Sequence, residues 1–303
     1  MIKIPPYLKA GDTIGITCPA GYMAAEKAAS CINTLQYWGY EVLVGKTLGS
    51  NSENYFSADD QTRLDELQEM LDDKHIKAIL FGRGGYGMSR IIDQLNFKKF
   101  RKNLKWLIGF SDITVLQMHL LSTYNIATLH APMAAAFNDN EHNNEYILSL
   151  RDALEGRKAY YECASHPFNI QGSAKGELIG GNLALLAHII GSSSDFKTKN
   201  RILFLEDIGE YLYSIDRMLY QLKRSGKLKN IAGLILGGFS DMKDTERPFG
   251  KSMDEILKQF TEALECPVCF NFNVSHNREN VALKIGVKYH LTITAENTAL
   301  SEL

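Results

Sequence analysis

The sequence predicts an α/β protein with two domains: a mostly parallel sheet of Rossmann or flavodoxin type in the first, and a smaller α/β domain after it. Three observations support this prediction. Apolar segments of strand length alternate with segments of helical periodicity, which is the pattern of β–α–β units. The strand segments are apolar almost throughout, as expected for strands that are covered on both faces. The length of 303 residues is long enough for about two domains.

The first domain is predicted over residues 1–160. A helix over 23–38 follows from small and aliphatic residues that recur at helical spacing. The segment 76–81 is apolar at nearly every position and predicts a buried strand. The same reasoning predicts further strands at 13–18, 41–44, 106–110 and 127–130, and helices from Ser57 through Leu71 and from Asp112 to about Leu121.

The second domain is predicted over residues 161–303. The boundary lies within the polar, turn-rich stretch 137–172, which contains one helix. Apolar and periodic segments again alternate beyond it. They predict strands at 174–179, 202–205, 231–236 and near 268–272, a long alternating strand around 281–294, and helices at 182–190, 212–223 and 253–264.

Composition excludes several classes of protein. A net charge of -2 and a pI near 6.5 argue against nucleic acid as the main partner. The chain has neither a polybasic patch nor an apolar run of about 18 residues, so no membrane association is expected. Pro5, Pro6 and Lys9 interrupt any signal-peptide core, which predicts a cytoplasmic protein; a leader removed from the chain is the open alternative. The 5 cysteines are scattered and do not form a disulfide framework.

A glycine cluster follows the predicted strand 76–81. Residues Gly82–Gly87 match the dinucleotide-binding pattern G-x-G-x-x-G. That pattern normally opens the first β–α–β unit, whereas this one follows the third strand, and the next strand ends without an acidic residue. The alternative is a tight turn whose exposed N–H groups form an anion or oxyanion site.

Ser111 stands where a predicted strand meets a predicted helix, in Gly109-Phe-Ser-Asp-Ile. That is the placement of a nucleophile elbow, although Ile113 replaces the final glycine of G-x-S-x-G. The alternative is a serine that caps the following helix.

Two other motifs are weaker. Ser194-x-x-Lys197 lacks its companion motifs, and Cys266-x-x-Cys269 lacks a second pair for zinc and is read as structural.

An acidic residue and a histidine complete a pattern with Ser111. Glu206 ends an apolar strand, where a carboxylate is expected to face a crevice or to form a surface turn. His276 lies in a loop that leaves a strand. The order serine, glutamate, histidine is that of the α/β-hydrolases, although triads recur on unrelated folds.

At these places the chain resembles the LD-carboxypeptidases, a family of serine peptidases. The resemblance covers Gly82–Gly87, Gly109–Asp112, Gly180–Leu183, Leu203–Asp207, Tyr213–Arg217 and the His276 loop. It implies Ser111 as nucleophile, His276 as base and Glu206 as the residue that orients the base. It also implies an oxyanion hole on the backbone N–H groups of Gly85 and Asp112. Ser275, Lys284 and Ala131 depart from the family at positions that concern the substrate pocket.

The resemblance also implies a substrate. The family cleaves the amide between an L-configured centre and a terminal D-amino acid, which in murein tetrapeptide releases D-Ala. Such an enzyme must bind a free carboxylate, and Arg83 is the candidate by its charge, with a surface arginine as the alternative. A homodimer and no metal or organic cofactor are expected. The alternatives are a microcin-immunity type hydrolase of peptidyl adenylates, a dinucleotide-binding protein that uses Gly82–Gly87, and a ligand-binding module without catalysis.

Overall fold

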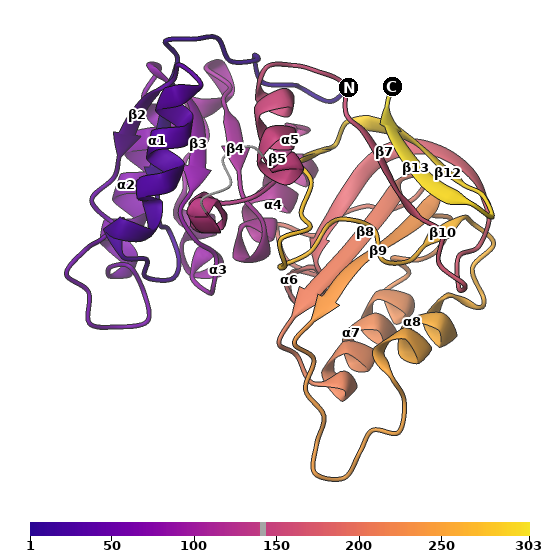
Figure 1. Ribbon diagram of the computed structural model, residues 1–303. Coiled ribbons are helices and arrows are strands. Elements are labelled where there is room, and N and C mark those ends of the chain that lie inside the picture. Colours follow the sequence, from indigo (N-terminus) through magenta and orange to yellow (C-terminus); the bar gives the residue numbers. More distant parts are fainter. Residues whose placement is uncertain (140–143) are drawn as a thin grey trace. The chain divides into compact units, whose positions relative to one another are not determined.

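The computed structural model describes residues 1–139 and 144–303 and divides the chain into two compact units (Figure 1). The first unit comprises Met1–Arg157 and Val281–Lys284. The second comprises Lys158–Asn280 and Ile285–Leu303. The units differ from the predicted domains in two respects. Residues 158–160, from the predicted first domain, belong to the second unit, and residues 281–284, from the predicted second domain, belong to the first.

The first unit is built on a six-stranded sheet with the order β11-β5-β4-β3-β1-β2. The neighbours among β1 to β5 pair in parallel, and the order 2-1-3-4-5 confirms the predicted flavodoxin-like sheet. In such a sheet, ligands bind beyond the carboxyl ends of the strands near the reversal between β1 and β3. The strands are β1 (Thr13–Thr17), β2 (Glu41–Val44), β3 (Ile76–Phe81), β4 (Trp106–Ile108), β5 (Thr128–His130) and β11 (Leu283–Ile285).

Helices connect these strands, and polar side chains cap two of them. Asp59 accepts a hydrogen bond from Thr62 N at the start of α2, and Asn144 accepts one from Ile147 N at the start of α5. The α-helices are α1 (Ala29–Tyr37), α2 (Asp60–Asp72), α3 (Met88–Ile91), α4 (Thr114–Tyr124) and α5 (Glu145–Leu154). Short 3-10 helices are η1 (Ala25–Ala28), η2 (Ile92–Gln94), η3 (Phe100–Lys102), η4 (Ser111–Ile113) and η5 (Ala134–Asp139).

The second unit contains a seven-stranded mixed sheet with the order β10-β9-β8-β7-β12-β13-β6. Strands β7 to β10 pair in parallel, and β12, β13 and β6 join them in antiparallel pairs. The strands are β6 (Tyr160–Ala164), β7 (Gly172–Asn182), β8 (Ile202–Ile208), β9 (Gly233–Ser240), β10 (Val268–Cys269), β12 (Lys288–Ile293) and β13 (Asn297–Glu302). The helices are α6 (Leu183–His188), α7 (Leu212–Arg224) and α8 (Met253–Thr261), and Figure 1 shows α7 beside α8.

The predicted strand around 281–294 is wrong, because the chain turns within it. Gly286 has a φ of 88°, a conformation that glycine adopts without steric cost. The residues before it form β11 in the first sheet, and those after it form β12 in the second. Strands β6 and β13 were not predicted, because both are short and neither is an uninterrupted apolar segment.

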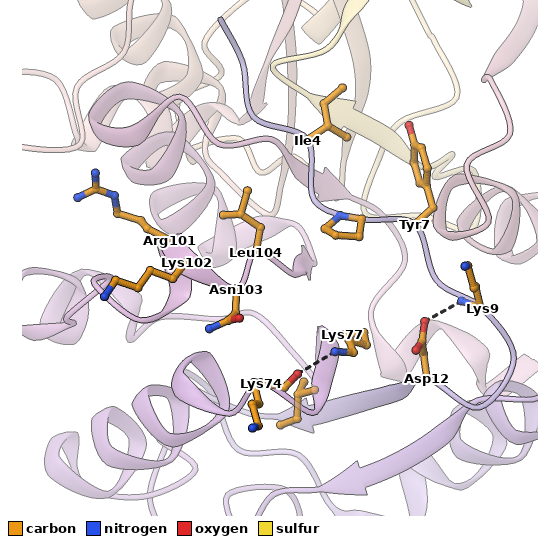
Figure 2. A pocket seen from close by; sticks show the side chains of 12 residues that line it. Ile4, Tyr7, Lys9, Asp12, Lys74, Lys77, Arg101, Lys102, Asn103 and Leu104 are labelled. Carbon is orange, nitrogen blue, oxygen red and sulfur yellow. Dashed lines mark hydrogen bonds between the residues drawn. The ribbon is translucent and has the colours of Figure 1, made fainter.

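A cavity of about 590 Å³ lies in the first unit, at the amino ends of β1, β3 and β4 (Figure 2). Five of its lining residues are basic: Lys9, Lys74, Lys77, Arg101 and Lys102. Figure 2 shows two hydrogen bonds at its wall, from Lys77 Nζ to the Lys74 carbonyl (2.8 Å) and from Lys9 N to Asp12 (2.7 Å). The cavity is therefore separate from the carboxyl ends of the strands, where Ser111 lies.

Within residues 1–139 and 144–303, no helix has both the length and the apolar character needed to cross a bilayer.

Candidate active site

Ser111 lies three residues beyond the carboxyl end of β4, in a strained conformation. Its φ is +62°, which is uncommon for a residue with a side chain. Phe110 takes the N-cap position of η4, so the structure excludes the helix-cap interpretation of Ser111. A sharp, strained turn of this kind is how a nucleophile elbow presents its hydroxyl above a parallel sheet.

The glycine turn after β3 packs directly against this serine. A Cβ on Gly84 would lie 2.8 Å from Ser111 Cβ and 3.0 Å from Ser111 Oγ, so a residue with a side chain cannot take its place without displacing the serine. The Gly84 carbonyl accepts a hydrogen bond from Gly21 N at 3.0 Å. This bond joins the turns that follow β1 and β3, at the point where the strand order reverses.

Gly85 is exposed beside Gly84 and has a φ of +98°. Its neighbourhood includes the Tyr55 hydroxyl, which would lie 2.9 Å from a Cβ at Gly85. Arg83 is exposed in the same turn, and its Nη1 donates to the Tyr22 carbonyl at 2.9 Å. That bond uses one nitrogen of the guanidinium group and holds the side chain near the start of the β1–α1 connection.

Asp112 connects the serine turn to the glycine turn through its side chain. The carboxylate is buried, and Oδ2 accepts a hydrogen bond from Met88 N at 2.8 Å. Burial raises the pKa of this carboxyl group to about 6. The Asp112 N–H lies in the first turn of η4, where backbone N–H groups lack partners within the helix.

The raised pKa of Asp112 predicts the sign of a pH effect on stability. Between about pH 4 and pH 6 the folded protein binds more protons at Asp112 than the unfolded chain does, so the free energy of unfolding falls as pH rises. The size is on the order of 3 kcal/mol, for a shift of about two units. We expect the difference in unfolding free energy between wild type and Asp112→Asn to fall from pH 4 to pH 7 and then to level off. Urea unfolding of both proteins measures it. A difference that is constant or rises with pH would contradict the assignment.

Arg63 was not singled out from the sequence, because an arginine on a helix usually lies at the surface. In the structure it is fully buried. Its Nη1 donates to the Pro19 carbonyl at 2.5 Å and to the Gly87 carbonyl at 3.4 Å, and its guanidinium group lies 4.8 Å from the centre of the Phe56 ring. It therefore holds the turn after β1 against the turn after β3.

The second unit contains the other two predicted triad residues, and the structure brings them together. Glu206 is fully buried near the end of β8, and its Oε2 lies 2.5 Å from His276 Nδ1. The His276 side chain is 11% exposed. The imidazole is therefore mostly buried but still accessible to solvent. A carboxylate in this position fixes the tautomer of the ring with its proton on Nδ1.

Asp207, the neighbour of Glu206, supports the start of α6. Its carboxylate accepts hydrogen bonds from Asn182 Nδ2 at 2.8 Å and from Ala184 N at 2.9 Å. Burial and the nearby Glu206 raise the pKa of Asp207 to about 6. Gly180 precedes this helix, and a Cβ there would lie 2.0 Å from the Phe204 carbonyl oxygen. The Gly-Gly-Asn segment therefore allows the start of α6 to pack closely against β8.

The loop that contains His276 rests on two glycines of β9 that sequence reasoning missed. A Cβ on Gly237 would lie 2.1 Å from the Val274 carbonyl oxygen, and one on Gly238 would lie 2.5 Å from Ser275 Cβ. Gly238 N donates to the Val274 carbonyl at 2.9 Å. Ser275 Oγ closes the loop by donating to the Glu279 carbonyl at 2.9 Å. The signal available in the sequence was the adjacent glycine pair within an apolar strand.

Gly238→Ala is expected to lower kcat about 100-fold while the protein stays folded, because a displacement of about 1 Å in a catalytic group has that effect. The added methyl group pushes on Ser275 and so moves the histidine that follows it. Steady-state kinetics and a thermal melt measure the two effects. Ser240→Ala in the same strand is the matched control. Equal activity in Gly238→Ala and wild type would contradict the role given to this glycine.

Among the described residues, no group of three or more histidine, cysteine or acidic side chains has a metal-binding arrangement. The thiols of the C-x-x-C motif are both free; Cys269 is buried and Cys266 is half-buried. Of the predicted catalytic residues, Ser111 belongs to the first unit, and Glu206 and His276 belong to the second.

Serine peptidases require a hydroxyl nucleophile, an imidazole to take its proton and a carboxylate to orient the imidazole. One unit of this chain presents a serine on a strained turn above a parallel sheet, and the other holds a buried carboxylate against an imidazole. The fold and these groups are those expected of a serine hydrolase. Comparison with known proteins defines the family.

Two family profiles match the chain: the LD-carboxypeptidase N-terminal domain over residues 14–131 and the LD-carboxypeptidase C-terminal domain over residues 175–291. A probable murein peptide carboxypeptidase of Bacillus subtilis (strain 168) is 33% identical over 98% of this chain and 94% of its own. The microcin C7 self-immunity protein MccF of Escherichia coli is 26% identical over 100% of this chain and 98% of its own. The crystal structure of muramoyltetrapeptide carboxypeptidase from Oxalobacter formigenes matches with a TM-score of 0.85 and 30% identity, covering 96% of this chain and 98% of that one. The chain belongs to the LD-carboxypeptidase family and is a serine-type enzyme.

Proposed function

We propose that this enzyme hydrolyses the amide bond between an L-configured centre and a terminal D-amino acid, and that it releases D-Ala from murein tetrapeptide. The observation that carries the proposal is the buried Glu206 carboxylate within 2.5 Å of His276 Nδ1. The names of two relatives support the substrate, since one is a probable murein peptide carboxypeptidase and the other a muramoyltetrapeptide carboxypeptidase. A role in peptidoglycan recycling follows from that substrate.

In the proposed reaction, His276 Nε2 accepts the proton of Ser111 Oγ as the oxygen attacks the carbonyl carbon of the scissile amide. Glu206 stabilises the imidazolium ion that forms. The imidazolium then gives its proton to the leaving amine, and the D-amino acid departs from an acyl-enzyme on Ser111. Water, deprotonated by His276, hydrolyses that ester and restores the serine.

Two backbone N–H groups are proposed to stabilise the oxyanion of the tetrahedral intermediate, those of Gly85 and Asp112. Gly84 supports this assignment, because it lies against Ser111, so the glycine turn is beside the proposed nucleophile. Donors of this kind contribute roughly 3–4 kcal/mol each to catalysis. Arg83 is proposed to bind the free carboxylate of the D-amino acid, since it is exposed in the same turn.

The test is incubation of the purified protein with murein tetrapeptide, with mass spectrometry for the loss of one alanine. The same peptide with a terminal L-alanine is the matched control and should stay intact. A peptidyl adenylate is offered in parallel, because the MccF relative makes a microcin-immunity type hydrolase the second candidate. Cleavage of the adenylate but not of the tetrapeptide would show that the substrate is a peptidyl adenylate and not a murein peptide. An intact tetrapeptide and an intact adenylate after long incubation would contradict both.

Three further measurements separate the remaining alternatives. Calorimetry with NAD tests the dinucleotide-binding interpretation of Gly82–Gly87, and a saturable affinity would contradict the oxyanion role of Gly85. Activity in EDTA is expected to stay unchanged; inhibition reversed by zinc would indicate a metallopeptidase. Light scattering tests the proposed homodimer.

A further inference from the structure

The two edge strands of the second unit's sheet approach each other, and a pair of thiols lies where they meet. Strand β6 is one edge of the sheet and β10 is the other. Cys163 on β6 and Cys269 on β10 nevertheless lie with their sulfur atoms 4.0 Å apart. The sheet therefore curves until its first and last strands are neighbours.

The chain segment between β6 and β7 reinforces this closure. Ile170 forms an antiparallel bridge with Val268 of β10, with two backbone hydrogen bonds of 3.0 Å. Asn169 Oδ1 accepts from Phe270 N at 2.8 Å, and the His166 ring stacks on Phe270 with centroids 5.3 Å apart. These contacts hold β10 beside the segment that leaves β6. The two thiols are therefore kept close together by several backbone and side-chain contacts.

We propose that Cys163 and Cys269 form a reversible disulfide when the protein meets a low-molecular-weight disulfide such as oxidised glutathione. A disulfide requires a sulfur–sulfur distance of about 2.05 Å, so the two atoms must approach by about 2 Å. Cys163 is half-buried on an edge strand and so has room to adjust, while Cys269 is buried and fixed. The 4.0 Å separation makes Cys163 the partner of Cys269, rather than the Cys266 of the C-x-x-C motif, which is interpreted as structural from the sequence.

The reaction is a balanced thiol–disulfide exchange. The Cys163 thiolate attacks one sulfur of the oxidised glutathione and releases one glutathione thiolate. The Cys269 sulfur then attacks the Cys163 sulfur of the mixed disulfide and releases the second. The two thiol protons pass to the two glutathione molecules, which take up two electrons in total. A hydrogen bond from Cys269 lowers the pKa of Cys163, which makes Cys163 the attacking thiol.

The test uses the full-length protein, incubated with oxidised glutathione, alkylated with N-ethylmaleimide and digested for mass spectrometry. The expected result is a cross-linked peptide that joins Cys163 to Cys269 and disappears with dithiothreitol. Cys266→Ser is the matched control and should keep the cross-link, whereas Cys163→Ser should lose it. The oxidised protein should melt on the order of 5 °C higher than the reduced protein, because the bond closes a long loop.

Several results would overturn the proposal. One is a cross-link between Cys266 and Cys269. Another is full alkylation of all five cysteines after the incubation, or a glutathione adduct on Cys163 that never resolves. If Cys163→Ser fails to fold, the peptide map of the wild type still decides the pairing.

Discussion

Ser111→Ala is expected to lower kcat on the proposed substrate, murein tetrapeptide, by about a factor of 10⁶, because removal of the proposed triad nucleophile eliminates the acyl-enzyme route. The fold should persist, since the substitution removes one oxygen atom from a half-buried position. The measurement is single-turnover kinetics with mass spectrometry of released alanine, alongside a thermal melt.

Ser122→Ala provides the control for this variant. Ser122 lies on α4, which follows the serine turn, and its hydroxyl donates to two helix carbonyls, those of Met118 and His119. This control should keep wild-type activity. Turnover by Ser111→Ala above about a tenth of the wild-type value would show that Ser111 is not the nucleophile.

Glu206→Gln is expected to lower kcat by about a factor of 10⁴. The glutamine has the shape of the glutamate, but its amide lacks the charge that stabilises imidazolium. It also offers an N–H group where the carboxylate accepts a hydrogen bond from Nδ1–H, so the ring can turn to the wrong tautomer. Kinetics over pH 6 to 9 and a thermal melt separate this catalytic effect from unfolding.

Glu262→Gln, at an exposed position beyond α8, is the control and should keep the kcat and the melting temperature of the wild type. If Glu206→Gln retains more than a hundredth of wild-type kcat, the carboxylate has no orienting role. Loss of the folded state instead of activity would show that the buried glutamate is structural.

Much of the first sheet was predictable, because its strands are apolar runs separated by periodic helices. Functional residues of a parallel sheet lie at the carboxyl ends of its strands. A serine and a glycine cluster at those ends therefore identified Ser111 and Gly84 as candidates. Glu206 stood out because an apolar strand seldom ends in a carboxylate. Local pattern drew attention to each of these residues, and the family resemblance assigned the catalytic roles that are proposed for them.

The remaining features depend on contacts between distant parts of the sequence. Arg63 looks like any surface residue of a helix, and only the turns around it explain its burial. Gly238 must lack a side chain because it packs against Ser275, which lies 37 positions later in the sequence. The sequence did not predict that these two residues are neighbours. The pairing of Cys163 with Cys269 depends on the curvature of a whole sheet, which no local pattern encodes.

The course of the backbone between the two units has a consequence for biosynthesis. The first unit takes its last strand, β11, from residues that follow nearly all of the second unit. A ribosome that adds about 5–20 residues per second needs roughly 6–25 s to travel from Arg157 to Val281. During that interval the nascent first unit has β5 as an uncovered sheet edge, while the second unit still lacks β12 and β13. Both units therefore reach completion only after Val281 has been synthesised, and a chain that stops before this residue completes neither unit.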